Sequence, residues 1–331
     1  MKAIIQYQTE NSTILRMAEV ASPTPSPTQL LVDVKATALN RADILQRKGA
    51  YPPPPGESSI LGLELAGVVR QVGDKVEGFS VGDRIFGLVS GGAYAEQTVI
   101  DHRLAMHIPE HWSFEDAAAV TEVFFTANET LFSRGQLEEG ETVLIHAGGS
   151  GVGSAAVQLA NQAGATVLAT AGTTEKARRV QELGATTCIC YKEEDFAEAI
   201  HKLTNGRGVD VIIDFIGADY LTQNLSLLKF EGRLVVVGLL SGSQAEIDLG
   251  QILRERLRII GFVMRRLPVS EKASIRNRFV DRWFDTLVKG QIQPVIDTVF
   301  PLYQANLAHK YMEENRNFGK IILKVANQLT I

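Results

Sequence analysis

The chain has 331 residues, of which 45% are hydrophobic and 21% charged, and its net charge at pH 7 is -5. This length allows two domains that each bury a core. The mild acidity argues against nucleic acid as a partner, because a nucleic-acid-binding face normally needs a basic excess. No apolar run reaches transmembrane length, and the amino terminus is typical of a first strand rather than a signal peptide. The two cysteines, Cys188 and Cys190, lie too close for a comfortable disulfide, so we expect a cytoplasmic protein with no membrane partner.

Residues 1–122 have the pattern of a β-rich domain, in which short alternating segments are separated by Pro and Gly. Strands are expected at Gln29–Ala36, Gly67–Val72, Arg84–Leu88 and Tyr94–Val99. The run Pro52–Pro55 cannot lie inside a helix. A helix is expected over Phe114–Ala119, because Ser113 is a suitable N-cap and acidic residues follow in the first turn.

Residues 123–262 alternate instead between short apolar strands and helices, which predicts a doubly wound parallel sheet. The expected strands are Thr142–Ala147, Thr166–Ala171, Thr187–Cys190, Asp210–Asp214, Arg233–Gly238 and Arg258–Phe262, and the expected helices are 151–164, 174–184, 194–204 and 219–228. The tail predicts a long helix over Glu271–Lys289, a strand at Val295–Pro301, a helix at Ala305–Asn315 and a last strand at Lys320–Val325. We expect these last elements to return to the β-rich domain.

A glycine-rich turn stands between the first expected strand and helix of the second region. The segment 143–160 runs from an apolar strand through Gly148, Gly149, Ser150, Gly151 and Val152 into a helix of small residues. Backbone amides at such a helix N-terminus bind pyrophosphate. Ser150 stands where a strict G-x-G-x-x-G pattern has its second glycine, but the following strand–helix units support nucleotide binding.

Several motifs follow one another in an order that resembles a known family. They are Ala38–Asp43, Gly62–Gly67, Val81–Ile85, Gly92–Glu96, the glycine-rich turn, Asp214–Gly217 and Ala308–Leu323. Together they resemble the quinone oxidoreductase branch of the medium-chain dehydrogenase/reductases over essentially the whole chain. The resemblance implies an α/β fold with a GroES-like β-rich catalytic domain (1–122 and 263–331), a Rossmann domain (123–262), an active-site cleft between them and a homodimer.

The positions where zinc-dependent members of the superfamily hold metal ligands carry Asn40 and Leu63 in this chain. Both cysteines lie in the second region, and the six histidines form no H-E-x-x-H or similar pattern. The sequence therefore predicts no metal. Without a Lewis acid, alcohol oxidation is disfavoured, and a substrate that already accepts hydride readily is favoured.

The choice of dinucleotide depends on the end of the second strand, where NAD-specific sites place a carboxylate. Residues 171–173 hold none, and Lys176 follows closely. By resemblance, Gly172, Lys176 and Tyr191 hold the 2′-phosphate end of NADPH, and Thr173 lies among them. Glu175 is near, so some use of NADH stays open.

The remaining site residues are expected at the nicotinamide end and in the cleft. The turns after the fourth and fifth expected strands lie at the same edge of the sheet, so we expect their residues to contact the cofactor. These residues are Ile216, Gly217, Gly238 and Leu239. Phe262 and Met264, at the end of the sixth strand, are also expected to contact the cofactor, and this edge strand can extend the sheet of a second subunit. By resemblance, Asn317 reaches back to the cofactor. In the cleft we expect Asn40, Asp43, Tyr51 and Thr126 to act on the substrate. Asn40 would bind substrate or water, Asp43 would hold its loop, and Tyr51 would form a wall for a flat ring, while Glu64 would accept hydrogen bonds beneath the site.

The resulting hypothesis is a metal-free, NADPH-dependent reduction of quinones by hydride transfer, with the cofactor supplying the chemistry. Reduction of an enone or enoyl thioester uses the same scaffold and stays open. A third alternative, from a different class, is a dinucleotide-binding sensor or structural protein with little turnover.

Overall fold

The computed structural model describes residues 1–8 and 13–325, and the chain divides into two compact units. The first unit comprises Met1–Phe125 together with the chain from Arg265 onward, and the second comprises Thr126–Met264. The predicted limits of the nucleotide domain, residues 123 and 262, lie three and two residues before the observed limits, 126 and 264.

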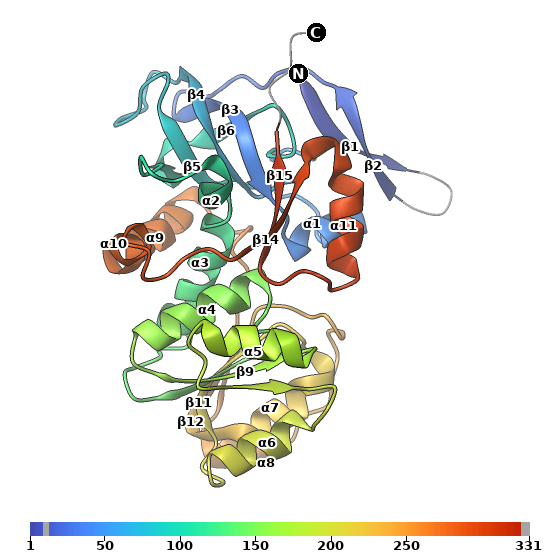
Figure 1. The fold of residues 1–331 in the computed structure, drawn as a ribbon, viewed down its shortest axis with the longest axis vertical. Helices are drawn as coiled ribbons and strands as arrows, with labels where there is room; N and C mark the ends of the chain where they lie inside the picture. Colours follow the sequence, from blue (N-terminus) through green and yellow to red (C-terminus); the bar gives the residue numbers. More distant parts are fainter. Residues whose placement is uncertain (9–12, 326–331) are drawn as a thin grey trace. The chain divides into compact units, whose positions relative to one another are not determined.

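The first unit is built on a mostly antiparallel sheet, to which the carboxyl-terminal segment adds two strands that pair parallel with each other (Figure 1). Its strands pair in the order β14-β15-β3-β4-β5-β7, with β6 also on β3. The bounds are β3 (Gln29–Ala38), β4 (Glu64–Val72), β5 (Arg84–Leu88), β6 (Gln97–Asp101), β7 (Ala105–His107), β14 (Ile296–Pro301) and β15 (Lys320–Lys324), and β1 (Lys2–Gln8) pairs separately with β2 (Thr13–Glu19). Because β15 pairs antiparallel with β3, the predicted return of the tail to the β-rich domain is confirmed.

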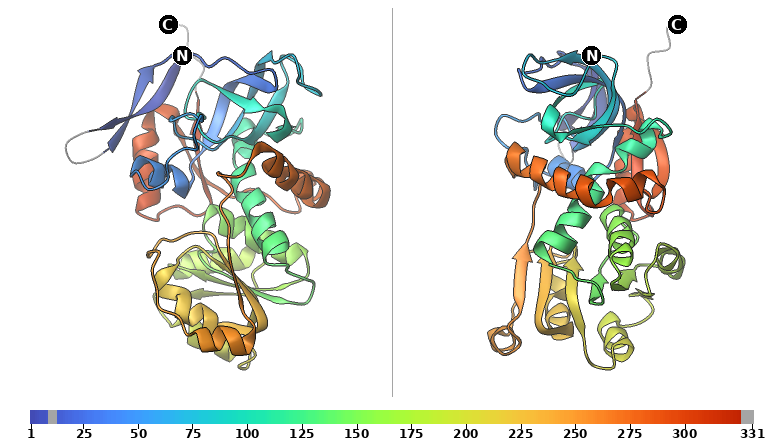
Figure 2. Two further views of the ribbon diagram at one scale, coloured as in Figure 1. Left: turned by 180° about the vertical axis from the view of Figure 1, so that it is seen from behind. Right: turned by 90° about the vertical axis from the view of Figure 1, so that its left-hand side faces the viewer.

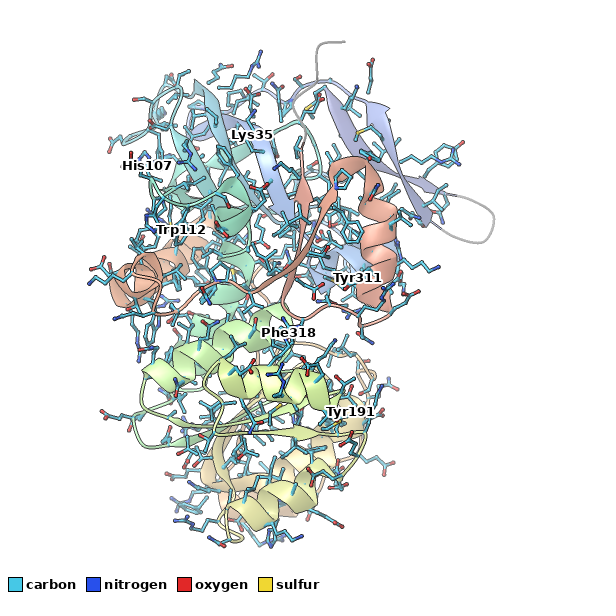
Figure 3. The ribbon with its side chains drawn as sticks, viewed as in Figure 1. Lys35, His107, Trp112, Tyr191, Tyr311 and Phe318 are labelled. Carbon is cyan, nitrogen blue, oxygen red and sulfur yellow. The ribbon has the colours of Figure 1, made fainter. Side chains whose placement is uncertain are left out.

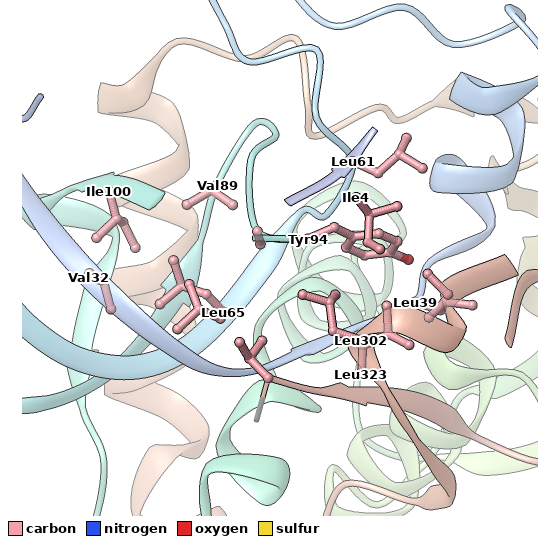
Figure 4. Close-up of a cluster of buried hydrophobic side chains, with 14 of the residues drawn as sticks. Ile4, Val32, Leu39, Leu61, Leu65, Val89, Tyr94, Ile100, Leu302 and Leu323 are labelled. Atoms are coloured by element: carbon pink, nitrogen blue, oxygen red, sulfur yellow. The ribbon is translucent and has the colours of Figure 1, made fainter. Parts of the chain in front are cut away.

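The core of this unit gathers side chains from the sheet and from the carboxyl-terminal segment. Val32, Leu65, Tyr94, Leu302 and Leu323 are all buried there (Figure 4). Alternate residues of β3 point into this cluster, as expected of a strand with one face in a core. The apolar clustering of distant segments stabilises the sheet on which the site residues of the first unit are carried.

Helices cover the first unit at positions that the sequence predicted only in part. They are α1 (Arg41–Arg47), α2 (Phe114–Ala118), α3 (Thr121–Asn128, which runs into the second unit), α9 (Val269–Phe279), α10 (Asp285–Val288) and α11 (Ala305–Glu313). The predicted N-cap is confirmed, because Ser113 Oγ accepts a hydrogen bond from the Asp116 amide at 3.0 Å. The helices α1 and α3 were not predicted.

The second unit is a parallel sheet with the strand order β10-β9-β8-β11-β12-β13. Its strands are β8 (Thr142–Ile145), β9 (Thr166–Ala171), β10 (Thr187–Cys190), β11 (Val209–Asp214), β12 (Leu228–Val236) and β13 (Arg258–Gly261), and its helices are α4 (Gly151–Gln162), α5 (Thr174–Glu182), α6 (Phe196–Leu203), α7 (Leu221–Leu227) and α8 (Leu249–Glu255). Right-handed crossovers place α4 and α5 on one face and α6 and α7 on the other (Figure 2). The predicted doubly wound Rossmann sheet is confirmed.

Most predicted elements differ from those observed by a few residues at one end, and three differ in a way that has a physical reason or changes the element. The strand predicted at Tyr94–Val99 begins at Gln97, because the Tyr94 amide donates to Leu61 and its carbonyl accepts from Ile4 instead of joining the sheet ladder. The helix predicted over 271–289 is interrupted by a π-helical turn at residues 280–284. The strand predicted from Arg233 begins at residue 228, with an irregular register beside β11. No helix among the described residues is long and apolar enough to cross a membrane.

Candidate functional site

The glycine-rich turn joins β8 to α4 by a tight approach of helix and strand. A Cβ added to Gly153 would lie 2.2 Å from the Ala147 carbonyl oxygen, so only glycine permits this packing. Ser150 is the N-cap of α4, and its Oγ accepts a hydrogen bond from the Gly153 amide at 3.0 Å. The Gly148 amide donates to the carbonyl of Thr170 on β9, which ties the turn to the next strand.

This turn fits the pyrophosphate of a dinucleotide. The amides at the first positions of a helix have no intrahelical acceptor, and in α4 these positions are Gly151 and Val152. Both residues, like the N-cap, are only partly buried. The Gly153 amide already donates to Ser150 Oγ. The amides of Gly151 and Val152, at the positive end of the helix dipole, can therefore donate to a bound anion.

His146 lies immediately before the turn and was not among the predicted site residues. Its ring is fully buried, with Nε2 2.7 Å from Asn224 Oδ1 and Nδ1 3.1 Å from Thr170 Oγ1. Burial lowers the pKa of His146 to about 4, so the ring is neutral near pH 7, donating from Nε2 and accepting at Nδ1. It links β8, β9 and α7 beneath the turn and holds the turn in place without adding charge.

The end of β9 brings together the residues predicted to bind the 2′-phosphate. A Cβ added to Gly172 would lie 2.8 Å from Tyr191 Oη, so glycine makes room for the phenol, which is labelled in Figure 3. Thr173 caps α5 and accepts a hydrogen bond from the Lys176 amide at 3.2 Å. Two acids lie near these residues, and both are engaged: Glu175 is bound to Arg178 at 2.8 Å, and Glu193 accepts a hydrogen bond from the Thr174 hydroxyl at 2.6 Å. The end of β9 therefore brings Gly172, Thr173, Lys176 and Tyr191 close together, and their binding of the 2′-phosphate stays a prediction.

The turns after β11 and β12 also lie side by side. The Asp214 carboxylate accepts hydrogen bonds from the amides of Ile216 at 2.7 Å and Gly217 at 3.1 Å. A Cβ on Gly217 would lie 3.1 Å from a Leu239 methyl carbon, and a Cβ on Gly238 would lie 2.9 Å from the Phe215 carbonyl oxygen. All four residues predicted for the nicotinamide end, Ile216, Gly217, Gly238 and Leu239, thus belong to one pair of interlocked turns.

The other predicted cofactor residues lie at the ends of this unit or outside it. The Phe262 amide donates to the Val236 carbonyl at 3.0 Å, and the Arg134 guanidinium lies over the Phe262 ring. Met264 is the last residue of the second unit, whereas Asn317 belongs to the first unit and donates from Nδ2 to the Gly319 carbonyl at 2.8 Å. The reach of Asn317 to the cofactor stays a prediction.

A buried polar network in the first unit surrounds Asn40. Its Nδ2 donates to Glu64 Oε1 at 2.9 Å, and its Oδ1 accepts from Lys320 Nζ at 2.7 Å. Lys320 Nζ also donates to Glu64 Oε1 at 2.8 Å and to the Leu39 carbonyl at 2.9 Å. The ion pair is buried, with 3% of the lysine side chain and 0% of the glutamate side chain exposed. Sequence reasoning missed Lys320, although a lysine that begins an apolar strand is a signal for a buried partner.

The second oxygen of Glu64 holds the start of α3. Glu64 Oε2 accepts from Thr121 Oγ1 at 3.1 Å and from the Glu122 amide at 2.9 Å. The carboxylate therefore accepts four hydrogen bonds, as the predicted supporting role of Glu64 requires. The buried Glu64 carboxylate thus fixes three segments relative to one another: the loop after β3, the strand β15 and the start of α3.

These residues do not fit a zinc ion. Leu63 is buried and apolar, and both ends of the Asn40 amide are engaged by Glu64 and Lys320. An ammonium group in contact with both polar side chains opposes a second cation at the same place. No group of three or more potential metal ligands occurs among the histidines, cysteines and acids of residues 1–8 and 13–325.

Asp43 holds its loop, as predicted. One oxygen accepts a hydrogen bond from the Asn40 amide at 2.8 Å, and the other accepts one from the Gly62 amide at 3.0 Å. The bond to Asn40 also caps α1. Burial raises the pKa of Asp43 to about 6, against the opposing effect of the two amides. The Tyr94 hydroxyl lies 3.4 Å from the same carboxylate and 3.3 Å from His309 Nε2.

Tyr51 stands beside a buried arginine that the sequence did not single out. The Arg265 guanidinium lies 5.3 Å from the Tyr51 ring centroid and donates to the Tyr51 carbonyl at 3.2 Å. Arg265 also binds the carbonyl of Ser90, whose hydroxyl accepts from Lys272 Nζ at 2.8 Å. Burial, followed by the charge of Glu122, raises the pKa of Tyr51 to about 12, so its hydroxyl stays protonated near neutral pH.

Thr126 lies one turn after Glu122 on α3. Residues four apart share a helix face, so Thr126 and Glu122 stand on the same face of α3. The Thr126 carbonyl accepts from Thr130 Oγ1 at 2.7 Å. The structure thus brings Asn40, Asp43 and Glu64 into one hydrogen-bonded network within the first unit. Helix α3, whose start is bound to Glu64, carries Thr126.

The chain is similar to known oxidoreductases over nearly its whole length. Residues 26–110 match the family described as "Alcohol dehydrogenase GroES-like domain", and residues 151–281 match that described as "Zinc-binding dehydrogenase". A mouse quinone oxidoreductase is 34% identical over 330 residues, covering 98% of this chain and 97% of the relative.

Two solved structures are similar in fold. The Escherichia coli quinone oxidoreductase complexed with NADPH superposes with a TM-score of 0.88 at 29% identity, covering 98% of this chain and 100% of that one. The CurK enoyl reductase has a TM-score of 0.81 at 28% identity, covering 94% and 95%. The finer likeness suggested by the motifs, to the tumour-suppressor-induced NADPH:quinone oxidoreductase of animals, stays a prediction. At the level that the whole-length identity supports, the chain belongs to the quinone oxidoreductase branch of the medium-chain dehydrogenase/reductase superfamily.

Proposed function

We propose that this protein uses NADPH to reduce quinones by hydride transfer, without a metal. One observation carries the proposal. Where zinc-dependent relatives hold metal ligands, this chain has Asn40 bound to the buried Glu64–Lys320 ion pair. An acceptor that needs no Lewis acid suits such a site, and the electron deficiency of a quinone already favours hydride uptake.

NADPH is the cofactor that the second unit fits best. The amides of Gly151 and Val152 would bind the pyrophosphate, and Lys176 with Tyr191 would bind the 2′-phosphate. No carboxylate stands at residues 171–173, and Glu175 is engaged by Arg178. When bound, NADPH supplies the hydride, and the turns at Gly217 and Leu239 would orient its nicotinamide. The complex of the E. coli relative with NADPH supports this choice.

The first unit would bind the acceptor. Tyr51, backed by Arg265 and followed by the stiff proline run, would form a flat wall for a planar ring. Asp43 and Glu64 would hold Asn40 in a fixed orientation next to the acceptor. Because the chain offers positioning rather than a metal, we propose that positioning and desolvation supply most of the rate.

Reduction of enones or enoyl thioesters is the second candidate function. The likeness to the CurK enoyl reductase favours it, since the same hydride geometry serves a polarised carbon–carbon double bond. A sensor or structural protein with little turnover is the third candidate, and it predicts NADPH binding without oxidation on any acceptor.

A panel of acceptors separates these candidates. We expect NADPH oxidation on planar ortho- and para-quinones, and much weaker activity on simple alcohols and saturated ketones. Tyr51→Phe, which keeps the ring, is the matched control for Tyr51→Ala, which should raise the quinone KM while NADPH affinity stays nearly unchanged. Efficient oxidation of small alcohols with no activity on any quinone would contradict the proposal.

We also propose a cytoplasmic homodimer that joins through β13. This strand is an edge of the parallel sheet, and Ile259 on it is 42% exposed. An unpaired edge with apolar side chains is a template for pairing with a second copy. Light scattering should give the mass of a dimer, and Ile259→Lys should shift it toward the monomer, whereas a wild-type monomer would contradict this assembly.

A further inference from the structure

Glu122, in the first turn of α3, stands beside the buried network but takes no part in the predicted mechanism. Its amide donates to Glu64 Oε2 at 2.9 Å, while Glu64 Oε1 binds Lys320 and Asn40. The side chain is half-buried. A second carboxyl therefore lies next to a carboxylate whose charge Lys320 already balances.

The Glu122 carboxyl is held by no hydrogen bond or ion pair from the described part of the chain, although its amide is bound. It lies near the acceptor residues Tyr51 and Thr126 that the sequence predicted. Its charge acts on the Tyr51 phenol, and it shares a helix face with Thr126. A carboxyl that is free of protein partners and close to the acceptor residues can exchange a proton with a bound molecule.

We propose that Glu122 is the proton donor of the reaction, passing the proton of its carboxyl group to the oxyanion that hydride addition leaves on the acceptor. This inference rests on the proposed function and adds a catalytic residue to it.

The surroundings of Glu122 keep it protonated near pH 7. Burial, and after it the negative charge of Glu64, raises the pKa of Glu122 to about 8. Lys320 and Lys272 oppose this shift, whereas Asp43 adds to it. These groups face Glu122 from β4, β15, α9 and α1, and Tyr51 and Arg265 complete the cluster. Near pH 7 the acid form is the larger population, which a general acid requires.

The step balances for both acceptor classes. A quinone gains two electrons and one hydrogen as hydride, which leaves a hydroquinone monoanion. The Glu122 O–H bond then breaks, the phenolate oxygen takes the proton, and a neutral hydroquinone forms. Water reprotonates the Glu122 carboxylate before the next turnover. With an enone, the same proton goes to the enolate.

Kinetics on the whole protein test the assignment. With NADPH and a para-quinone, wild-type kcat should fall about tenfold for each pH unit above the pKa of about 8. Glu122→Gln should lower kcat by about 10²- to 10⁴-fold and remove this inflection, while NADPH affinity and the quinone KM stay near wild type. Glu122→Asp should restore part of kcat together with the inflection. The control is Glu115→Gln, which removes a carboxyl from the first turn of α2 and should leave the pH profile unchanged.

Infrared spectroscopy supplies a readout that does not depend on turnover. The wild type at pH 7 should show the C=O stretch of a protonated carboxyl that titrates near pH 8 and is missing in Glu122→Gln. Absence of that band in the wild type would overturn the proposal. Wild-type kcat and an unchanged pH profile in Glu122→Gln would overturn the role of Glu122 alone. A wild type that reduces no acceptor would overturn the proposed function, and the proton-transfer role with it.

Discussion

Single side chains decide which charges this protein buries and which it leaves in water. Lys320 and Lys324 lie on the same strand, β15, and each pairs with a glutamate. The first pair is almost fully buried, whereas 63% of the Lys324 side chain is exposed in its pair with Glu115. The same residue type therefore has very different energetic consequences four positions apart.

Removing the buried cation should cost far more stability than removing the exposed one. Lys320→Met leaves the Glu64 carboxylate buried without its counter-charge, and we expect a loss of about 3–5 kcal/mol in the free energy of unfolding. Lys324→Met should change it by about 1 kcal/mol or less. Urea denaturation of the two variants measures both values, and equal losses would show that the Lys320 pair is not the anchor of the network.

Lys176 is the residue that should distinguish the two dinucleotides. Lys176→Ala should weaken NADPH binding by about 1–3 kcal/mol, because a charge-assisted contact to the 2′-phosphate is lost, and leave NADH binding nearly unchanged. Lys202→Ala, which removes a lysine from the last turn of α6, is the control. Titration calorimetry with both cofactors gives the comparison. Equal losses for NADPH and NADH would mean that Lys176 does not read the phosphate.

At the scale of elements, the junction of β8 and α4 depends on backbone contact rather than on side chains. The Gly153 Cα lies so close to the Ala147 carbonyl that no side chain fits between them. Ala147 itself has a positive φ of 49°, an uncommon conformation for a residue other than glycine. The strand and the helix are thus brought together at the point where the pyrophosphate is proposed to bind.

An alanine at this junction should therefore displace the helix. Gly153→Ala should lower the free energy of unfolding by about 1–3 kcal/mol, since the new methyl group overlaps a backbone oxygen. It should also weaken NADPH binding, because the amides of the first helical turn move. Gly261→Ala is the matched control, because nothing lies within 4 Å of its added Cβ. Thermal unfolding and NADPH titration of both variants check this. Wild-type stability and NADPH affinity in Gly153→Ala would show that the helix and the strand can move apart at little cost.

At the scale of the whole molecule, neither unit contains all the residues that the proposed reaction needs. The cofactor residues belong mainly to Thr126–Met264, and the acceptor residues Asn40 and Tyr51 belong to the other unit. We expect NADPH-dependent quinone reduction to survive exhaustive chelation, with no stoichiometric zinc in the purified protein. A one-to-one zinc content that tracks activity would contradict it.

Residue periodicity, glycine turns and helix caps in the sequence predicted a β-rich part, a nucleotide-binding part and most of their elements. Strand and helix periodicity predicted every strand of the parallel sheet, and two of them, Thr166–Ala171 and Thr187–Cys190, have the predicted bounds. Periodicity identified these strands because buried parallel strands are continuous apolar runs. Glycine turns and helix N-caps next to them mark where each strand ends. The short helices α1 and α3 were missed for different reasons. The start of α3 is held by Glu64, 58 positions away, which no local pattern shows. Helix α1 begins at a local cap, in which Asp43 accepts a hydrogen bond from the Asn40 amide, but its seven residues are too few for a clear helical periodicity.

The contacts of the buried network around Glu64 depend on segments that come together only in the folded chain. Lys320 and Glu64 are 256 positions apart, and no local pattern pairs them. The sequence indicated that Asn40 replaces a metal ligand, but only the fold brings the Lys320 ammonium against it and places Glu122 beside Glu64. Protonation states depend on burial and on neighbouring charges, and both arise when distant strands pack together. The acid that we assign to proton transfer is therefore a property of the folded chain, not of the residues near it in sequence.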